Sequence, residues 1–181
     1  MCFVKPTCKD TCTHKIGCDF GGIVWNYIFR LPCSLTNDTF QFKIVHTISA
    51  CNYMLQICGK RDNNLCEFCC DNCTDDLYHC FVECTFAVDF WRTLFSFWMK
   101  VFSISIPIDK MDILFRILNF NDDKIIHCLN FTLLIAKYYI YNCKSQATNL
   151  NFTSYCKELK QSLEAKNISC IEMIKDKSSI C

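Results

Sequence analysis

The chain has 181 residues, a formal net charge of +1, 51% hydrophobic residues and 20% charged residues. The apolar fraction is enough to fill a core, and only 4 Gly and 3 Pro exclude a collagen-like, linker or low-complexity protein. The near-neutral charge excludes a globally basic nucleic-acid binder, while 18 cysteines indicate either a disulfide scaffold or metal ligation.

Whether the cysteines form disulfides or bind a metal depends on the cellular compartment of the protein. The N-terminal residues contain no apolar segment of signal-peptide length, and the apolar stretches 90–108 and 125–143 are interrupted by polar or charged residues. We therefore expect no membrane partner and an intracellular location, nuclear or cytoplasmic, where thiols stay reduced. Metal ligation is favoured over a disulfide scaffold in that setting, also because disulfide scaffolds usually lack a large apolar core.

The N-terminal part predicts a lead-in followed by two helices. Residues 1–24 carry scattered cysteines with no apolar period, so we expect them to be poorly ordered. Trp25, Ile28 and Phe29 predict a short helix that ends at Pro32. Apolar residues at three- and four-residue steps then predict one longer helix that ends near Gly59: Phe40, Ile44, Ile48, Cys51 and Leu55.

The middle of the chain is polar and turn-rich over residues 60–76. Asp75 and Asp76 suit a helix N-terminus, so a helix is expected to begin there. A longer helix is predicted over Phe86–Phe102, with one broad apolar face: Phe90, Trp91, Leu94, Phe95, Trp98 and Phe102.

Three further helices are expected toward the C-terminus. Ile113, Leu114 and Ile117 fit a short one. Asp122 and Asp123 are candidates to cap the next helix, whose apolar stripe is Ile126, Leu129, Leu133, Ala136 and Ile140. The last is predicted over Phe152–Lys166, with a buried stripe of Tyr155, Leu159 and Leu163.

These elements predict a mostly α fold: a helical domain over residues 25–168 with a small CCHC zinc-binding turn, and a tail over 169–181. Strands are expected at most as a pair near the cysteine turn. The chain shows no internal repeat at solenoid periods.

The cysteine-rich turn has the ligand spacing of a structural zinc site. Cys66 and Cys69 form a C-x2-C pair, and His79 and Cys84 follow as H-x4-C. Residues five apart diverge by about 140° on a straight α-helix, so we expect His79 on a helix and Cys84 at its frayed end. Bound Zn²⁺ would hold the cysteine turn against that helix. It would also orient the 86–102 helix onto the 40–55 helix.

The exact ligand set stays open at this point. Cys70 and Cys73 form a second C-x2-C pair, and Cys80 adjoins His79. Any of these three residues is an alternative to a proposed ligand. A closed site with four protein ligands would be structural rather than catalytic, because catalytic zinc keeps an open position.

Several blocks in fixed order resemble a known family. They are Trp25 to Pro32, Phe40 to His46, the C-x2-C pair, the His79 to Cys84 segment, Phe90-Trp91, Ile113 to Phe115 and Leu133 to Tyr141. Together they resemble the C-terminal zinc-binding region that follows the reverse transcriptase domain in LINE-type (non-LTR) retrotransposon polyproteins. The resemblance implies Zn²⁺ on Cys66, Cys69, His79 and Cys84, a reverse transcriptase domain as partner, and association with nucleic acid. It also suggests that the chain is a fragment of such a polyprotein.

No catalytic constellation is found in the sequence, so we expect neither an enzyme nor a small-molecule substrate. His46 and His127 lie in apolar runs and are expected to be buried or half-buried structural residues.

The segment 61–89 is acidic and should repel phosphate. Weak RNA or DNA binding is expected instead from a cationic–aromatic stretch: Lys137, Tyr138, Tyr139, Tyr141 and Lys144. The alternative is a zinc-stapled protein-interaction domain with no nucleic-acid binding of its own.

Overall fold

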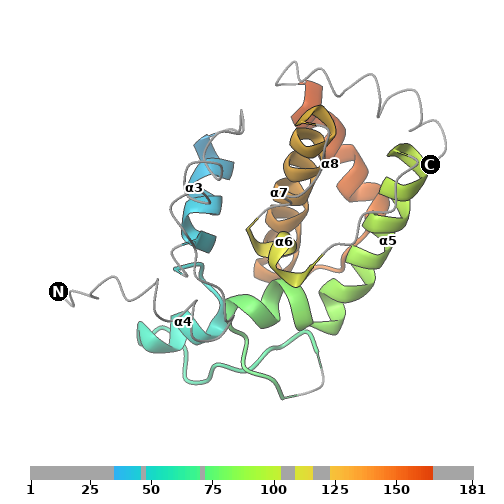
Figure 1. The fold of residues 1–181 in the computed structure, drawn as a ribbon. Coiled ribbons are helices and arrows are strands. Elements are labelled where there is room, and N and C mark those ends of the chain that lie inside the picture. The colour runs from blue at the N-terminus through green and yellow to red at the C-terminus, as the bar shows by residue number, and fades with distance from the viewer. Residues whose placement is uncertain (1–34, 46–47, 70–71, 103–108, 116–122, 165–181) are drawn as a thin grey trace.

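The computed structural model describes residues 35–45, 48–69, 72–102, 109–115 and 123–164 (Figure 1). Its elements are α3 (Leu35–Val45), α4 (Asn52–Ile57), a π-helical turn η1 (His79–Glu83), α5 (Thr85–Phe102), α6 (Lys110–Leu114), α7 (Asp123–Ser145) and α8 (Phe152–Glu164). Within these ranges the β-type pairing is one isolated bridge between Leu65 and Thr74. The predicted mostly helical class is confirmed.

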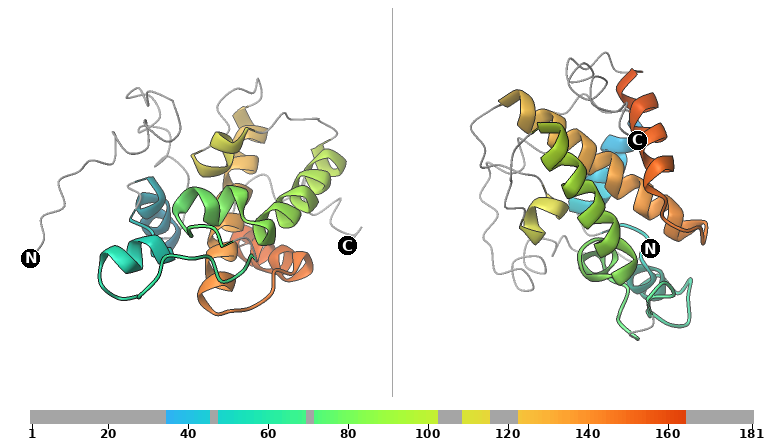
Figure 2. Two further views of the ribbon diagram at one scale, coloured as in Figure 1. Left: turned by 90° about the horizontal axis from the view of Figure 1, so that it is seen from below. Right: turned by 90° about the vertical axis from the view of Figure 1, so that its right-hand side faces the viewer.

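Helix α7 is the central element of the fold, with α3 on one side and α8 on the other (Figures 1 and 2). Every residue from 128 to 137 is buried, as expected for a helix that is apolar around most of its circumference. Helix α3 packs on α7 through Phe40, whose ring lies 5.2 Å from that of Tyr138 and 5.3 Å from that of Tyr141. The sequence predicts that this segment packs on the 86–102 helix. In the structure α3 packs mainly on α7 instead.

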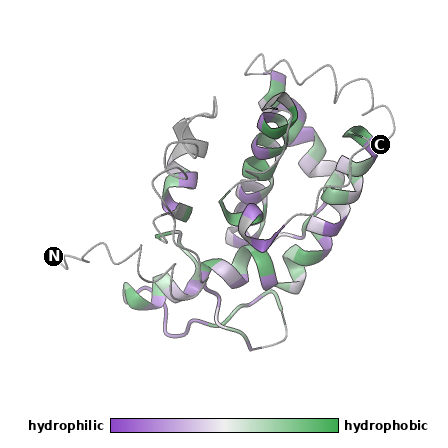
Figure 3. Cartoon of the chain, in the orientation of Figure 1, coloured by the Kyte–Doolittle hydropathy of each residue, from purple (hydrophilic) through white to green (hydrophobic). Residues whose placement is uncertain are grey.

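Helices α5, α7 and α8 share an aromatic core. The ring of Phe90 on α5 lies within 6.0 Å of those of Tyr139, Phe152 and Tyr155. The hydroxyl of Tyr155 donates to the carbonyl oxygen of Thr132 over 3.0 Å, which satisfies the one polar group of that buried side chain. Hydrophobic residues are accordingly frequent along both α5 and α7 (Figure 3).

The strongly periodic helices were predicted correctly. Helix α5 matches the predicted 86–102 segment, and α8 matches the predicted C-terminal helix. Their stripe residues are largely buried, as are most of those on α7: Phe90, Trp91, Leu94, Trp98, Leu129, Leu133, Ala136, Ile140, Tyr155, Leu159 and Leu163.

The single helix predicted from Phe40 to Leu55 is wrong, because residues 48–51 are not helical and separate α3 from α4. Ile48 is 49% exposed and does not continue the buried stripe. The backbone N–H of Asn52 donates instead to the Asp75 carboxylate over 3.1 Å, so α4 begins against the cysteine-rich segment. The helix ends as predicted, with Gly59 at φ +66° just beyond it, a conformation that favours glycine.

Other predictions fall outside the described residues: the 1–24 lead-in, the helix at Trp25, His46, Cys70, Ile117, Asp122 and the 169–181 tail. His127 is exposed, so its predicted burial is wrong; it faces away from the buried stripe of α7. None of the helices in the part of the chain that the structure describes is long and apolar enough to span a membrane.

Candidate metal centre

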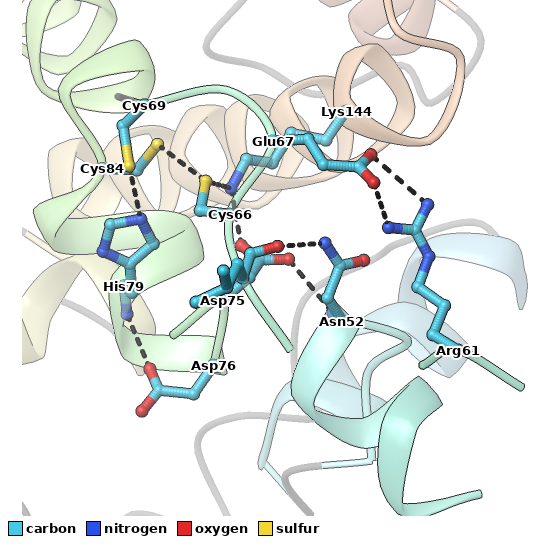
Figure 4. Close-up of polar contacts among 11 residues, drawn as sticks. Asn52, Arg61, Cys66, Glu67, Cys69, Asp75, Asp76, His79, Cys84 and Lys144 are labelled. Carbon is cyan, nitrogen blue, oxygen red and sulfur yellow. Dashed lines mark hydrogen bonds and ion pairs between the residues drawn. The ribbon is translucent and has the colours of Figure 1, made fainter. Parts of the chain in front are cut away.

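Four buried side chains converge beside the start of α5 (Figure 4). Cys66 and Cys69 come from the loop between the bridged residues Leu65 and Thr74, His79 begins η1, and Cys84 lies between η1 and α5. Their three sulfur atoms and the imidazole nitrogen all lie within 4.8 Å of one another. The structure thus brings together the four residues that the spacing singled out, in an arrangement that can hold a metal ion.

Two distances in the cluster are close to the edges of a tetrahedral metal site. Cys66 Sγ lies 3.7 Å from Cys84 Sγ, and Cys69 Sγ lies 3.3 Å from His79 Nε2. Tetrahedral zinc, with Zn–S and Zn–N bonds of about 2.3 and 2.05 Å, would separate two sulfurs by about 3.8 Å and a sulfur and a nitrogen by about 3.6 Å. A disulfide would need about 2.05 Å between the sulfurs, so Cys66 and Cys84 are free thiols and do not form a bridge.

The loop that carries the first two cysteines is closed by backbone hydrogen bonds. The N–H of Cys66 donates to the carbonyl of Cys73 over 2.8 Å, and the N–H of Asp75 donates to the carbonyl of Asn64 over 2.7 Å. These paired bonds tie the two ends of the loop together around Cys69. The thiols of Cys66 and Cys69 are consequently held near each other by local backbone structure.

The other two residues of the cluster, His79 and Cys84, are placed by the π-helical turn. The N–H of Cys84 donates to the carbonyl of His79 over 2.8 Å, an i→i+5 bond. The helical segment that leads into this turn starts at residue 77 and is capped by Asp76, whose carboxylate accepts the N–H of His79 over 2.8 Å. The acidic N-terminus agrees with the prediction. The predicted frayed end is wrong, because Cys84 directly follows an ordered π turn and its N–H is bonded to it.

A buried ion pair adjoins the sulfur cluster. Lys144 on α7 donates to the Asp75 carboxylate over 2.9 Å and lies 3.7 Å from Cys66 Sγ (Figure 4). The other carboxylate oxygen of Asp75 accepts the N–H of Asn52 on α4. Sequence spacing gave no signal for this contact, because Lys144 is 69 residues from Asp75 along the chain.

The protonation of these groups follows from burial and charge. The pKa of Cys84 is raised to about 12, chiefly by burial; the Lys144 charge opposes this rise and the Cys66 thiol adds to it. Burial also raises the pKa of the neighbouring Cys80. Burial would lower the pKa of Lys144, but Cys80 and Asp75 outweigh it and the net shift is upward. Lys144 therefore stays charged, whereas an ion that binds Cys84 must displace its proton.

The alternative ligands stand apart from this cluster where they are described. Neither Cys73 nor Cys80 belongs to the group of atoms within 4.8 Å, and Cys70 lies outside the described residues. Cys80 is fully enclosed next to Phe81 in the core, so its side chain has a packing role.

The residues predicted to contact nucleic acid lie mostly in the interior. Lys137 is 2% exposed and donates to Gln41 Oε1 and the Leu114 carbonyl, and Tyr139 is buried beside Phe90. Lys144 is held in its ion pair, while Tyr138 and Tyr141 are half-buried against Phe40. Lys137 and Tyr139 therefore have little exposed surface for a nucleic acid, and the predicted RNA or DNA binding through this stretch stays a prediction.

Within the described part of the chain, the Cys66, Cys69, His79 and Cys84 cluster is the group of three or more ligand-type side chains that can hold a metal ion. The three thiols and the imidazole of this cluster are therefore the basis for a proposed function. No protein-family model, curated protein or solved structure matches this chain.

Proposed function

We propose that the chain is a non-catalytic helical module held together by one structural Zn²⁺ ion on Cys66, Cys69, His79 and Cys84. The observation that carries this proposal is the convergence of three thiols and one imidazole within 4.8 Å in a buried site. Two of the ligands come from the cysteine loop and two from η1 and its C-terminal end, so one ion would fasten the cysteine loop to the base of α5.

The donor set favours zinc over other common ions. Mg²⁺ and Ca²⁺ take oxygen ligands, whereas a mixed sulfur and nitrogen set with tetrahedral edges suits Zn²⁺. Four protein ligands complete the coordination of Zn²⁺ and leave no position for water or substrate. This is why the proposed role is structural.

The energetic role is large for a domain of this size. Structural zinc in small peptides contributes about 10–16 kcal/mol at neutral pH, against a total stability of about 5–15 kcal/mol for typical domains. Loss of the ion would therefore release the cysteine loop and loosen the contact between η1 and α5.

The proposed ancestry is the C-terminal zinc-binding region of a LINE-type reverse transcriptase polyprotein, based on the ordered blocks in the sequence. In that setting the module would pack on the reverse transcriptase domain. Exposed apolar side chains near the cysteine loop support a protein partner. Tyr53 and Ile57 lie one turn apart on α4, and Leu65 is joined to the same helix because its carbonyl accepts the Asn52 side chain over 2.7 Å.

Association with RNA or DNA is the second candidate function. Exposed lysines on α8, Lys157 and Lys160, would carry it in place of the enclosed lysines of α7. The acidic residues Asp62, Glu67 and Glu83, all exposed around the metal centre, weigh against phosphate contact there.

Two measurements test these proposals. Native mass spectrometry of the full chain should count one zinc ion that strong chelators remove; a chain that takes up no ion would refute the zinc module. Filter binding to single-stranded RNA at two salt concentrations separates the partners. Binding that weakens steeply with salt would favour the nucleic-acid role, and no binding at low salt would favour the protein-docking role.

A further inference from the structure

We propose that Lys144 is a positioning residue of the metal centre, whose charge sets the affinity for the ion and couples its binding to the end of α7. This inference rests on the proposed zinc site. It concerns a residue that contacts a ligand sulfur without itself being a ligand.

The geometry places one cation between two sources of negative charge. Lys144 Nζ lies 3.7 Å from Cys66 Sγ and 2.9 Å from Asp75 Oδ1, and it lies 5.5 Å from the centre of the Phe68 ring. The side chains of Lys144 and Asp75 are only 7% and 9% exposed. Water therefore screens these charges weakly, and their attraction is stronger than at a surface.

Charge arithmetic shows why the lysine matters to the ion. Three thiolates, a neutral imidazole and Zn²⁺ leave a net charge of −1, and the Asp75 carboxylate adds a second negative charge. Lys144 compensates one of these two. Without it, Asp75 would be a buried carboxylate beside an anionic metal centre, and unpaired buried charges are costly.

The same contacts couple the ion to three elements of the fold. Lys144 comes from α7, and Asp75 follows the cysteine loop. Asp75 is fixed by α4, since its carboxylate accepts the N–H of Asn52 and its carbonyl accepts the N–H of Tyr53 over 3.2 Å. An ion that draws Cys66 into place therefore also favours the docking of α4 and α7.

Helix α7 offers a matched control in Lys137. It is a second enclosed lysine on the same helix, seven residues or about 10 Å earlier, and it donates to Gln41 and the Leu114 carbonyl on α3 and α6. Lys137→Met should lower the melting temperature through these lost bonds. It should leave the affinity of the folded protein for the ion unchanged.

The test uses the full chain, Zn²⁺ competition against a chromophoric chelator, and Co²⁺ absorption spectra at one fixed pH. Lys144→Met should weaken Zn²⁺ binding by about 10- to 100-fold, the usual range for lost outer-shell partners. It should also shift the sulfur-to-cobalt charge-transfer band to lower energy, because the Cys66 thiolate loses a hydrogen-bond donor. Lys144→Arg, which keeps the charge, should retain most of the affinity.

Asp75→Asn supplies a second variant that keeps the cation in place. Because it removes a competing carboxylate, it should bind Zn²⁺ at least as tightly as the wild type; weaker binding would contradict the inference. Wild-type affinity and an unshifted band in Lys144→Met would overturn it, as would equal losses of affinity in Lys144→Met and Lys137→Met. A wild-type chain that binds neither ion would instead refute the proposed zinc site itself.

Discussion

The backbone N–H of Cys84 donates to the carbonyl oxygen of His79, and this i→i+5 bond gives the H-x4-C pair its geometry. On a regular α-helix, side chains five residues apart diverge by about 140°. The wider π turn with its i→i+5 bond reduces this divergence, so the side chains of His79 and Cys84 lie in one cluster with the Cys66 and Cys69 thiols. The H-x4-C spacing, which is unsuited to two ligands on a regular α-helix, therefore suits a single ion in this structure.

Loss of a ligand should unfold the centre of the molecule. Cys66→Ser and Cys84→Ser should each remove most of the stabilisation from the ion and lower the melting temperature by more than about 10 °C. Cys58→Ser is the matched control, because Cys58 is exposed at the end of α4. Thermal melts of zinc-loaded proteins check this, and similar melting of all three variants would contradict the ligand assignment.

Removal of the ion should have the same effect as removal of a ligand. Excess chelator should lower the melting temperature of the wild-type chain, and added Zn²⁺ should restore it, whereas Mg²⁺ and Ca²⁺ should not because they prefer oxygen ligands. Circular dichroism at 222 nm follows this transition. An unchanged melting curve in chelator would show that the fold does not depend on the ion.

The cap of the helical segment that leads into the π turn should contribute measurably to stability. Asp76→Ala removes the acceptor of the His79 N–H and should cost about 1 kcal/mol in the free energy of unfolding, while Asp76→Asn and Asp76→Ser should retain most of it. Denaturant titrations of the zinc-loaded proteins measure these differences. Equal losses for all three substitutions would indicate that Asp76 acts through its charge and not as a cap.

Glu158 on α8 should weaken the fold at neutral pH. Burial raises its pKa above the ordinary value of 4.5, so the folded state holds the proton more tightly than the unfolded state. By linkage, stability falls as pH rises from about 4.5 through the folded pKa and stays lower above it. Glu158→Gln should be more stable than the wild type at pH 7, by under about 1 kcal/mol, with no advantage below about pH 4. A stability advantage of Glu158→Gln that is independent of pH would contradict the explanation by the raised pKa of Glu158.

The helices that sequence periodicity predicts well are those with one apolar face. Helices α5 and α8 are of this kind, and Leu94 and Leu159 are buried as the stripe requires. Helix α7 is enclosed along residues 128–137, so the polar residues within that stretch do not mark a surface. Lys137 reads as a solvent-facing cation in the sequence, yet its partner Gln41 lies 96 residues away and makes its burial tolerable.

The parts of the candidate metal centre that depend on residues close in sequence could likewise be predicted, and the parts that depend on distant residues could not. The C-x2-C and H-x4-C pairs are local, so their spacing could single out all four residues of the cluster. The Lys144–Asp75 pair and the break between α3 and α4 depend on contacts between distant segments. Asn52, for example, starts α4 by donating to a carboxylate 23 residues later, which no helical period encodes.

The most direct test of the zinc centre is X-ray absorption at the zinc edge on the full chain loaded with one equivalent of Zn²⁺. Coordination by Cys66, Cys69, Cys84 and His79 predicts three sulfur neighbours at about 2.3 Å and one nitrogen at about 2.0–2.1 Å. Removal of His79 by His79→Cys should convert this to four sulfurs. A shell of oxygen and nitrogen, or four sulfurs in the wild-type chain, would contradict the account.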